Sequence, residues 1–204
     1  VASTGKPIII STGMASIAEL DDTVSAARDA GCDEIILLKC TSTYPATPEN
    51  TNILTIPHMR NLFKCEVGLS DHTMGIGVSV SSVSLGATVI EKHFTLDRSE
   101  GGVDSTFSME PKEMSDLVIE TERAWQALGD VHYGVTEAEK KSLAFRRTLY
   151  IVKDLKKGEI FNKENVRAIR PGLGLPTKYL DVVLGKRVSE DVSKGTALAW
   201  NLIE

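Results

Sequence analysis

The sequence is poor in cysteine and in aromatic residues, and it has no long apolar run. Its three cysteines, Cys32, Cys40 and Cys65, are scattered, which excludes a disulfide framework and a zinc-binding spacing. We expect free thiols in the cytoplasm, where thiols stay reduced. No apolar run reaches the roughly 18 residues of a membrane-spanning helix. The net charge of −5 is not the basic charge that is typical of a nucleic-acid-binding protein. We therefore expect no membrane and no nucleic acid as partners.

What the sequence contains is an alternation of β-branched runs and helical patterns over its first 129 residues. The composition, 42% hydrophobic and 25% charged, is that of an ordinary globular protein. Strands are expected at 6–12, 33–45, 65–72 and 87–94, and helices at 16–31, 52–63 and 110–129. Ser16 and Glu19 have the spacing of a capping box, and Gly31 is typical of a helix end. Such alternation predicts a parallel sheet built from βα units.

Residues 73–86 allow two interpretations. Val78, Val80 and Val83, interrupted by serines, suggest the alternation of a strand, whereas Ile76, Val80 and Val83 also lie at helical spacing. Parallel strands need a crossover connection, which is usually a helix. We therefore expect a helix here, against the local propensity of the valines and serines.

The pattern changes after residue 129. Residues 130–145 are polar and charged and are expected to be a linker, and residues 146–204 are expected to form a second, small domain. This domain repeats short strands around Lys-Gly turns and has a helix-start signal at Asn162. A closed (β/α)₈ barrel needs eight strands. The four expected strands therefore predict an α/β fold, the C-terminal half of such a barrel, within a longer chain.

Ionisable and hydroxyl side chains gather where the expected strands end, which is where (β/α)₈ barrels carry their active sites. These ends supply Ser11, Ser42, Tyr44, Ser70, His72 and His93. Hydroxyl groups and a lysine, for which Lys6 is the candidate, can hold a phosphate. Two imidazoles at equivalent positions on neighbouring strands can bind a divalent metal such as Mn²⁺. The pattern therefore indicates a phosphate and metal site.

Each of these residues also has a structural interpretation. A histidine at a strand end is often a hydrogen-bonded structural residue, and a lysine before a proline is often simply solvated. Asp71 and Glu91 are either ligands or partners that orient the histidines. His58 and His132 lie in polar segments outside the expected strands, and we interpret both as surface residues.

Several motifs in register identify a family resemblance that covers nearly the whole chain. The segments KPIIISTGM, CTSTYP, GLSDHT, GATVIEKHFTLDR and RPGLGLP occur in this order and resemble the sialic acid (nonulosonic acid) synthase family. The segments GGVDSTFSMEP and FRRTLYIVKDLKKGEIF are most similar to its pseudaminic acid synthase branch. One departure is Ser42, which stands where N-acetylneuraminate synthases tend to have asparagine.

The resemblance implies a fold and an activity. The fold would be a (β/α)₈ barrel followed by a small antifreeze-like SAF (β-clip) domain. The reaction would condense phosphoenolpyruvate with a 2,4-diacetamido-2,4,6-trideoxy hexose to give pseudaminic acid and phosphate, for surface glycans or flagellin glycosylation. The resemblance also calls for a glutamate and a lysine from early strands that this sequence does not contain, so these 204 residues alone are expected to be inactive.

The resemblance also implies roles for individual residues. His72 and His93 would bind the metal, Mn²⁺ or Mg²⁺, and take part in catalysis. Around phosphoenolpyruvate would lie Lys6, Ser11, Ser42, Tyr44 and Ser70. Asp104 would face the sugar, and Arg170 would reach the acetamido group of the sugar bound in the partner subunit of a domain-swapped homodimer.

Two alternatives stay open. One is an N-acetylneuraminate or legionaminate synthase, which performs the same chemistry on an N-acetylmannosamine-type sugar. The other is a carbohydrate-binding SAF module attached to an inactive barrel fragment, which would not need a metal.

Overall fold

The computed structural model describes residues 1–204 and divides them into two compact units. The first unit is Val1–Asp130 and the second is Val131–Glu204. Each is described by itself below. No helix in the structure combines the length and the apolar character needed to span a membrane.

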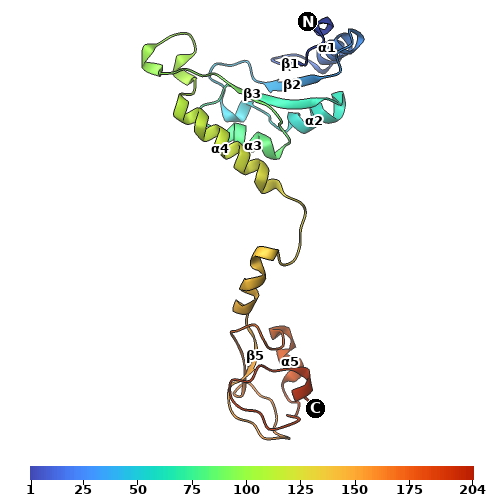
Figure 1. Cartoon of the computed structure of the whole chain (residues 1–204), viewed down its shortest axis with the longest axis vertical. Helices are drawn as coiled ribbons and strands as arrows, with labels where there is room; N and C mark the ends of the chain where they lie inside the picture. The colour runs from blue at the N-terminus through green and yellow to red at the C-terminus, as the bar shows by residue number, and fades with distance from the viewer. The chain divides into compact units, whose positions relative to one another are not determined.

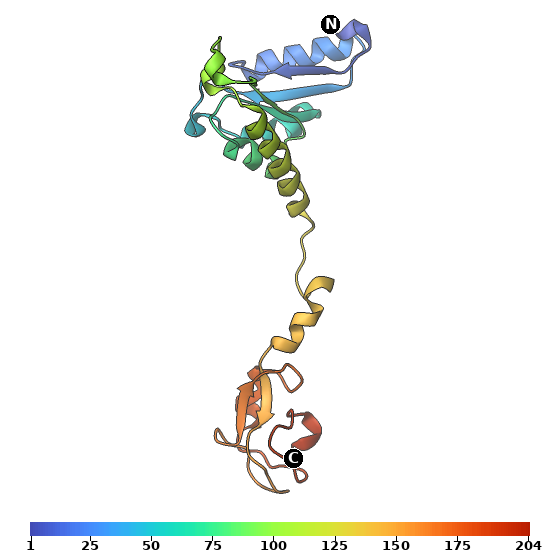
Figure 2. The ribbon, with the colours of Figure 1, turned by 60° about the vertical axis from the view of Figure 1, so that its left-hand side comes forward.

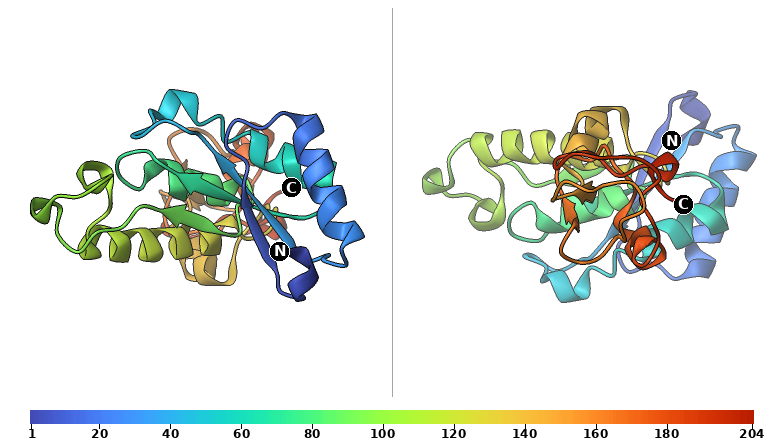
Figure 3. Two further views of the ribbon diagram at one scale, coloured as in Figure 1. Left: turned by 90° about the horizontal axis from the view of Figure 1, so that it is seen from above. Right: turned by 90° about the horizontal axis from the view of Figure 1, so that it is seen from below.

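A four-stranded parallel sheet forms the centre of the first unit (Figure 1, Figure 3). Its strands β1 (Ile8–Ser11), β2 (Ile35–Cys40), β3 (Glu66–Asp71) and β4 (Ile90–Lys92) lie in the order of the sequence. All three neighbouring pairs are parallel, so the carboxyl ends of the strands meet at one edge. The predicted half of a (β/α)₈ barrel is confirmed.

Helices connect the strands and follow the last one. They are α1 (Ile17–Asp29), α2 (Thr55–Phe63), α3 (Gly77–Ser84) and α4 (Pro111–Leu128). Ser16 and Glu19 form the predicted capping box: the Glu19 carboxylate accepts from the Ser16 backbone N–H at 2.7 Å. The ambiguous segment is helical, as expected, because α3 supplies the crossover between β3 and β4.

The two faces of the sheet differ in what they carry. One face packs against the helices through a continuous core: Leu37 of β2 and Leu69 of β3 contact this core together with Val24 of α1 and Ile56 of α2. Because side chains alternate along a strand, the residues between these core positions point to the other face. We call that opposite surface the site face. Its members near the carboxyl ends of the strands are Ser11, Ser70, His72, Glu91 and His93.

The second unit has a core of its own around a short antiparallel pair (Figure 2). Strands β5 (Thr148–Ile151) and β6 (Val166–Ile169) form that pair, and α5 (Leu180–Val183) follows. The helix expected to start at Asn162 does not form. The Asn162 side chain instead accepts from the backbone N–H groups of Glu164 and Asn165 and closes a turn that leads directly into β6.

The segment expected to be a linker also contains structure. Residues Glu137–Phe145 form a 3₁₀ helix, and the Ala144 carbonyl accepts from the Gly172 backbone N–H at 2.9 Å. The linker prediction overlooked a capping box within this polar segment, in which the Glu139 carboxylate accepts from the backbone N–H and the hydroxyl of Thr136.

Candidate active site

The two histidines predicted from the strand ends lie side by side on the site face. Their ring centroids are 5.1 Å apart, and the ring planes meet at 73°. The register explains the proximity: Asp71 of β3 pairs with Lys92 of β4, so the next residue of each strand is a histidine at the same height. Parallel pairing of two similar strand ends is therefore sufficient to bring His72 and His93 together.

The ring of His72 is held in one orientation by the loop after β2. Its Nδ1 lies 2.8 Å from the carbonyl oxygen of Thr41, and the residue is only 6% exposed. A carbonyl oxygen can only accept, so Nδ1 carries the proton and donates it. In the neutral imidazole this leaves the lone pair on Nε2, which is the tautomer that a metal-binding histidine needs.

The ring of His93 has a carboxylate and an aromatic ring as neighbours. Its Nδ1 lies 3.6 Å from Asp104 Oδ2, and its centroid lies 5.0 Å from that of Phe107. The Tyr44 ring contacts both histidines, with centroids 4.3 Å from His72 and 5.8 Å from His93. The predicted residues Tyr44 and Asp104 are thus part of the histidine cluster, whereas Phe107 was not anticipated.

Two of the predicted serines share one carboxylate. Ser70 donates to Glu91 Oε1 at 2.7 Å, and Ser11 donates to the same oxygen at 3.5 Å. A hydroxyl group has a single hydrogen to donate, so neither serine can donate to Glu91 and to a ligand at once. A phosphate that takes these hydrogens must displace the Glu91 carboxylate.

Beneath the histidines, on the helix side of the sheet, lies a buried ion pair. Lys92 Nζ is 3.0 Å from Asp71 Oδ2, and the two side chains are 2% and 0% exposed. Asp71 was considered as a metal ligand or as a partner that orients a histidine. Strand alternation points it away from the site face, so it does not lie among the candidate ligands.

The remaining predicted residues, Ser42, Lys6 and Arg170, lie in three different places. The Ser42 hydroxyl lies beside Gly13, just after the end of β1, at 3.4 Å from the position a Gly13 Cβ would occupy. Lys6 lies before the first residue of β1, whereas Ser11 is the last residue of that strand, so the two residues lie at opposite ends of β1. The Lys6 carbonyl oxygen accepts a hydrogen bond from Cys32 Sγ at 3.5 Å. The structure does not bring Lys6 together with the strand-end residues.

Arg170 belongs to the second unit and lines a hollow of about 670 Å³ there. The other cationic side chains of that hollow are Arg147, Lys163 and Arg167, and no acidic residue lines it. An anionic or strongly polar group would be attracted to such a surface.

The histidine pair fits a divalent metal in chemistry but does not make a complete site by itself. No group of three or more histidine, cysteine, aspartate or glutamate side chains converges as a metal cluster. His72 presents the correct tautomer and His93 has a carboxylate near its other nitrogen, as metal-ligating histidines commonly do. The chain therefore offers two imidazole ligands, and substrate or water would have to supply the remaining ones.

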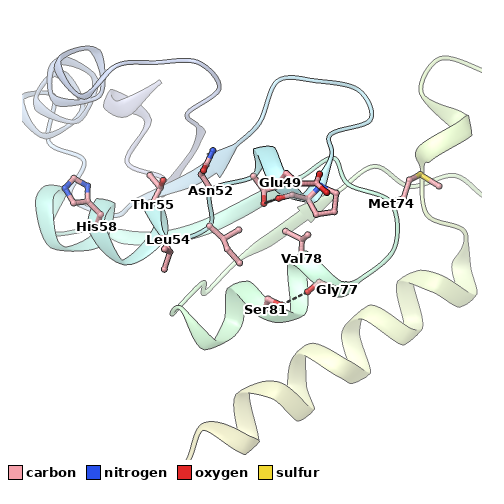
Figure 4. A pocket seen from close by; sticks show the side chains of 12 residues that line it. Glu49, Asn52, Leu54, Thr55, His58, Met74, Gly77, Val78 and Ser81 are labelled. Atoms are coloured by element: carbon pink, nitrogen blue, oxygen red, sulfur yellow. Dashed lines mark hydrogen bonds between the residues drawn. The ribbon is translucent and has the colours of Figure 1, made fainter.

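A wide hollow of the first unit lies elsewhere. It measures about 870 Å³ and is lined by residues before and within α2, by the loop after β3 and by the start of α3, among them Glu49, Leu54, His58 and Met74 (Figure 4). None of the predicted site residues lines it, and its two ionisable side chains, Glu49 and His58, lie apart from each other (Figure 4). The predicted residues His72, His93 and Tyr44 gather in the histidine cluster instead.

Sequence reasoning missed the contacts that orient the cluster. The Ser11–Glu91 contact joins residues that are 80 positions apart, and no local sequence pattern predicts it. Lys39 donates to the Cys40 carbonyl and to Thr41 Oγ1 and so supports the loop whose carbonyl holds His72. Burial lowers the pKa of Lys39. The matched order of SDH and EKH was the one available signal for the Asp71–Lys92 pair.

Comparison with known proteins identifies the family. The NeuB family profile matches residues 1–133, and the SAF domain profile matches residues 146–204. The chain belongs to the NeuB family. This assignment agrees with the resemblance seen in the sequence motifs, and the SAF match identifies the second domain.

Two curated relatives come from Campylobacter jejuni serotype O:2. Its pseudaminic acid synthase is 42% identical over 198 residues, which are 97% of this chain and 58% of that protein. Its N,N′-diacetyllegionaminic acid synthase is 39% identical over 189 residues, which are 91% of this chain and 57% of that protein. The chain thus spans somewhat more than half the length of the curated relatives it matches.

A solved structure has the same fold. The N-acetylneuraminic acid synthetase of Leptospira borgpetersenii, in complex with citrate, superposes with a TM-score of 0.63 at 36% identity. The match covers 70% of this chain and 50% of that protein. The half-barrel assignment is therefore supported by an experimental relative as well as by the strand order.

Proposed function

We propose that this chain is the part of a nonulosonic acid synthase that holds the histidine pair. The enzyme would condense phosphoenolpyruvate with a 2,4-diacetamido-2,4,6-trideoxy hexose and release pseudaminic acid and phosphate. The observation that carries the proposal is the convergence of His72 and His93 at the strand edge where barrel enzymes perform their chemistry. The free thiols suit a reducing cytoplasm, where we place the reaction.

The chain's own residues would bind and orient the substrates. Ser11, Ser70 and Ser42 lie near the strand ends as hydroxyl donors for the phosphate and carboxylate of phosphoenolpyruvate, once Glu91 releases the first two. Tyr44 would cover the histidines with its ring and exclude water on that side. Asp104, half-buried beside His93, would accept from a hydroxyl group of the sugar. Lys6, at the other end of β1, is not included in this proposal.

His72 and His93 would hold the metal, Mn²⁺ or Mg²⁺, through their ring nitrogens. When bound, such a metal supplies Lewis-acid polarisation of the sugar carbonyl. The protein would contribute the hydrogen bond from His72 Nδ1 to the Thr41 carbonyl, which sets the tautomer and the orientation of the ring. A ring that has already lost its rotational freedom binds a ligand at a lower entropic cost.

The choice of sugar rests on similarity. The pseudaminic acid synthases of two Campylobacter jejuni strains are 42% and 43% identical to this chain, and the legionaminic acid synthases of two bacteria are 39% and 38% identical. We therefore favour the pseudaminic acid precursor and keep a legionaminate- or neuraminate-type sugar as the second candidate. Arg170 would contact the acetamido group of the sugar in a partner subunit of a domain-swapped homodimer.

The proposal is tested with a chimera, because the chain spans 58% of the Campylobacter jejuni synthase. The segment of that synthase that this chain does not match is joined to residues 1–204, and phosphate release is measured with phosphoenolpyruvate, each candidate sugar and Mn²⁺. Turnover that is highest with the 2,4-diacetamido sugar and lost in His93→Ala is expected. A folded chimera whose turnover is unaffected by His93→Ala would contradict the role of the histidine pair.

A further inference from the structure

In the buried ion pair of Asp71 and Lys92, beneath the histidines, both carboxylate oxygens and the ammonium group are fully hydrogen-bonded. Asp71 Oδ1 accepts from the backbone N–H and the hydroxyl of Thr73, at 2.9 and 2.8 Å. Asp71 Oδ2 accepts from Ser79 at 2.6 Å and from Lys92 at 3.0 Å. Both carboxylate oxygens are thus used twice, and three different elements meet at one side chain.

Lys92 is equally saturated. Its ammonium group has three hydrogens, and these go to Asp71, to the Thr73 carbonyl at 2.7 Å and to the Gly75 carbonyl at 2.9 Å. The loop after β3 therefore folds around an ammonium group that belongs to β4. Because this loop begins at His72 and Lys92 immediately precedes His93, the pair joins the backbones of both histidines.

Stability alone does not account for this arrangement. Removing two charges from water is costly, and well-packed apolar residues of similar volume usually stabilise a fold as well or better. What a saturated ionic network supplies instead is a single geometry, since any displacement of the loop or strand leaves a buried charge or carbonyl without its partner.

We propose that Asp71 and Lys92 are positioning residues that fix the separation and orientation of His72 and His93. This role rests on the proposed function, because a set spacing of two imidazoles matters for holding a divalent metal. The pair acts from the helix side of the sheet, so it touches neither substrate nor metal. It determines instead where the strand end and the following loop present the two rings.

The variant that tests the proposal replaces both charges by apolar residues of similar volume, Asp71→Leu with Lys92→Met. The Thr73 and Gly75 carbonyls then lose their donor, so the loop is released while no unpaired charge stays buried. A matched control is Lys112→Met with Asp116→Leu, which removes an exposed pair of the same type, with side chains 84% and 48% exposed.

The first measurement needs no metal. The exchange rate of the His72 Nδ1 proton with water is measured by NMR in the metal-free chain, since the hydrogen bond to the Thr41 carbonyl protects this proton. We expect exchange at least tenfold faster in the Asp71/Lys92 double variant and no change in the control. Exchange within twofold of wild type in a folded double variant would overturn the proposal.

The second measurement separates this inference from the proposed function. Mn²⁺ affinity, followed by the EPR signal of the free ion, is expected to fall 10–100-fold in the double variant, as it does when partners of metal-ligating histidines are removed. If wild type does not bind Mn²⁺ but the proton exchange responds as expected, the metal role fails and the positioning role stands. An unchanged Mn²⁺ affinity in the double variant, beside a wild type that binds, overturns the positioning role.

A milder variant covers the case in which the double variant does not fold. Ser79→Ala removes one donor to Asp71 Oδ2 and leaves both charges in place. We expect at least threefold faster exchange of the His72 ring proton, and an unchanged rate would overturn the proposal.

Discussion

The two histidines of the cluster differ in how strongly their surroundings constrain the ring orientation. His72 is buried and bonded to a backbone carbonyl at 2.8 Å, whereas the His93 side chain is about one-third exposed and its carboxylate neighbour is 3.6 Å away. Under the proposed function, His72 would therefore be oriented before a metal binds, and His93 would have room to adjust its position.

Loss of His72 should strongly weaken metal binding without unfolding the protein. We expect His72→Ala to weaken Mn²⁺ binding by at least 100-fold, since the better oriented of two protein ligands is removed. The check is an EPR titration of free Mn²⁺, with circular dichroism to verify folding. His58→Ala is the matched control, because His58 is exposed and lies outside the cluster. Equal effects of the two substitutions would count against a metal site at His72.

Arg170 should affect one substrate only. It is exposed and makes no ion pair within its unit, so Arg170→Ala is expected to leave stability within about 0.5 kcal/mol. In the chimeric enzyme we expect the KM for the sugar to rise about tenfold and the KM for phosphoenolpyruvate to stay within twofold. Lys178→Ala removes the same charge from the same unit and should change neither constant. A parallel rise of both KM values would exclude a contact with the sugar alone.

At the scale of the elements, the close approach of β3 and β4 depends on Gly68. A Cβ at this position would overlap the carbonyl oxygen of Val89 and lie 2.7 Å from Leu38 Cδ2. The Leu69 backbone N–H donates to the same Val89 carbonyl at 2.8 Å. The absence of a side chain at residue 68 therefore lets the two histidine-bearing strands pair at their observed spacing.

Gly68→Ala should separate these strands. We expect a loss of stability of about 1–3 kcal/mol, as for other insertions into packed interiors, together with weaker Mn²⁺ binding. Urea unfolding and the EPR titration measure the two effects. Gly77→Ala is the control, because a Cβ there meets open space at the start of α3. If Gly68→Ala were as stable as wild type, the close packing of β3 against β4 would be wrong.

The capping box of α1 should make the protein sensitive to acid. Hydrogen bonds from the Ser16 backbone N–H and hydroxyl lower the pKa of Glu19. A carboxyl group whose pKa is lower in the folded state stabilises the fold above its ordinary pKa near 4.5, and this stabilisation is lost as the pH falls through the folded value. The contribution of the box is therefore complete at neutral pH.

Removal of the cap should consequently matter less in acid. Ser16→Ala is expected to cost about 1 kcal/mol at pH 7, and this cost should shrink below pH 4.5 as Glu19 takes up a proton. Urea unfolding at several pH values gives the comparison. Ser25→Ala, an exposed position in the same helix, should be nearly neutral throughout. A cost independent of pH would mean that Glu19 takes no part in the cap.

The parts of the fold that follow from local chemistry were predictable. The Ser16–Glu19 box, the crossover helix α3 and the histidines at matched strand ends each follow from spacing and parallel topology. The Asn162 turn was misread because an asparagine that accepts from the next backbone N–H groups serves a turn as well as a helix. The Ser11–Glu91 contact and the roles of Phe107 and the Thr41 carbonyl could not be foreseen, since they arise from contacts between residues that are far apart in the sequence.

At the scale of the whole molecule, the chain holds two hydrophobic cores with no common member. Buried residues of α1, α2, β2 and β3 make the first, and those of the second unit make the other. The two units also differ in charge, because most of the acidic residues lie before residue 131 and most of the basic residues lie after it. Each unit therefore has its own source of stability.

The second unit should fold by itself. Residues 131–204 include the 3₁₀ helix whose Ala144 carbonyl bonds to Gly172, and their core contains Leu149, Phe161 and Leu198, all fully buried. We expect this piece to show dispersed amide resonances and one cooperative transition in urea. Phe161→Ala should cost about 3–5 kcal/mol, which is enough to unfold so small a domain. The neighbouring substitution Ile160→Ala, at a position 47% exposed, should leave it folded. Collapsed amide dispersion in the wild-type piece would show that the second core depends on the first unit for its stability.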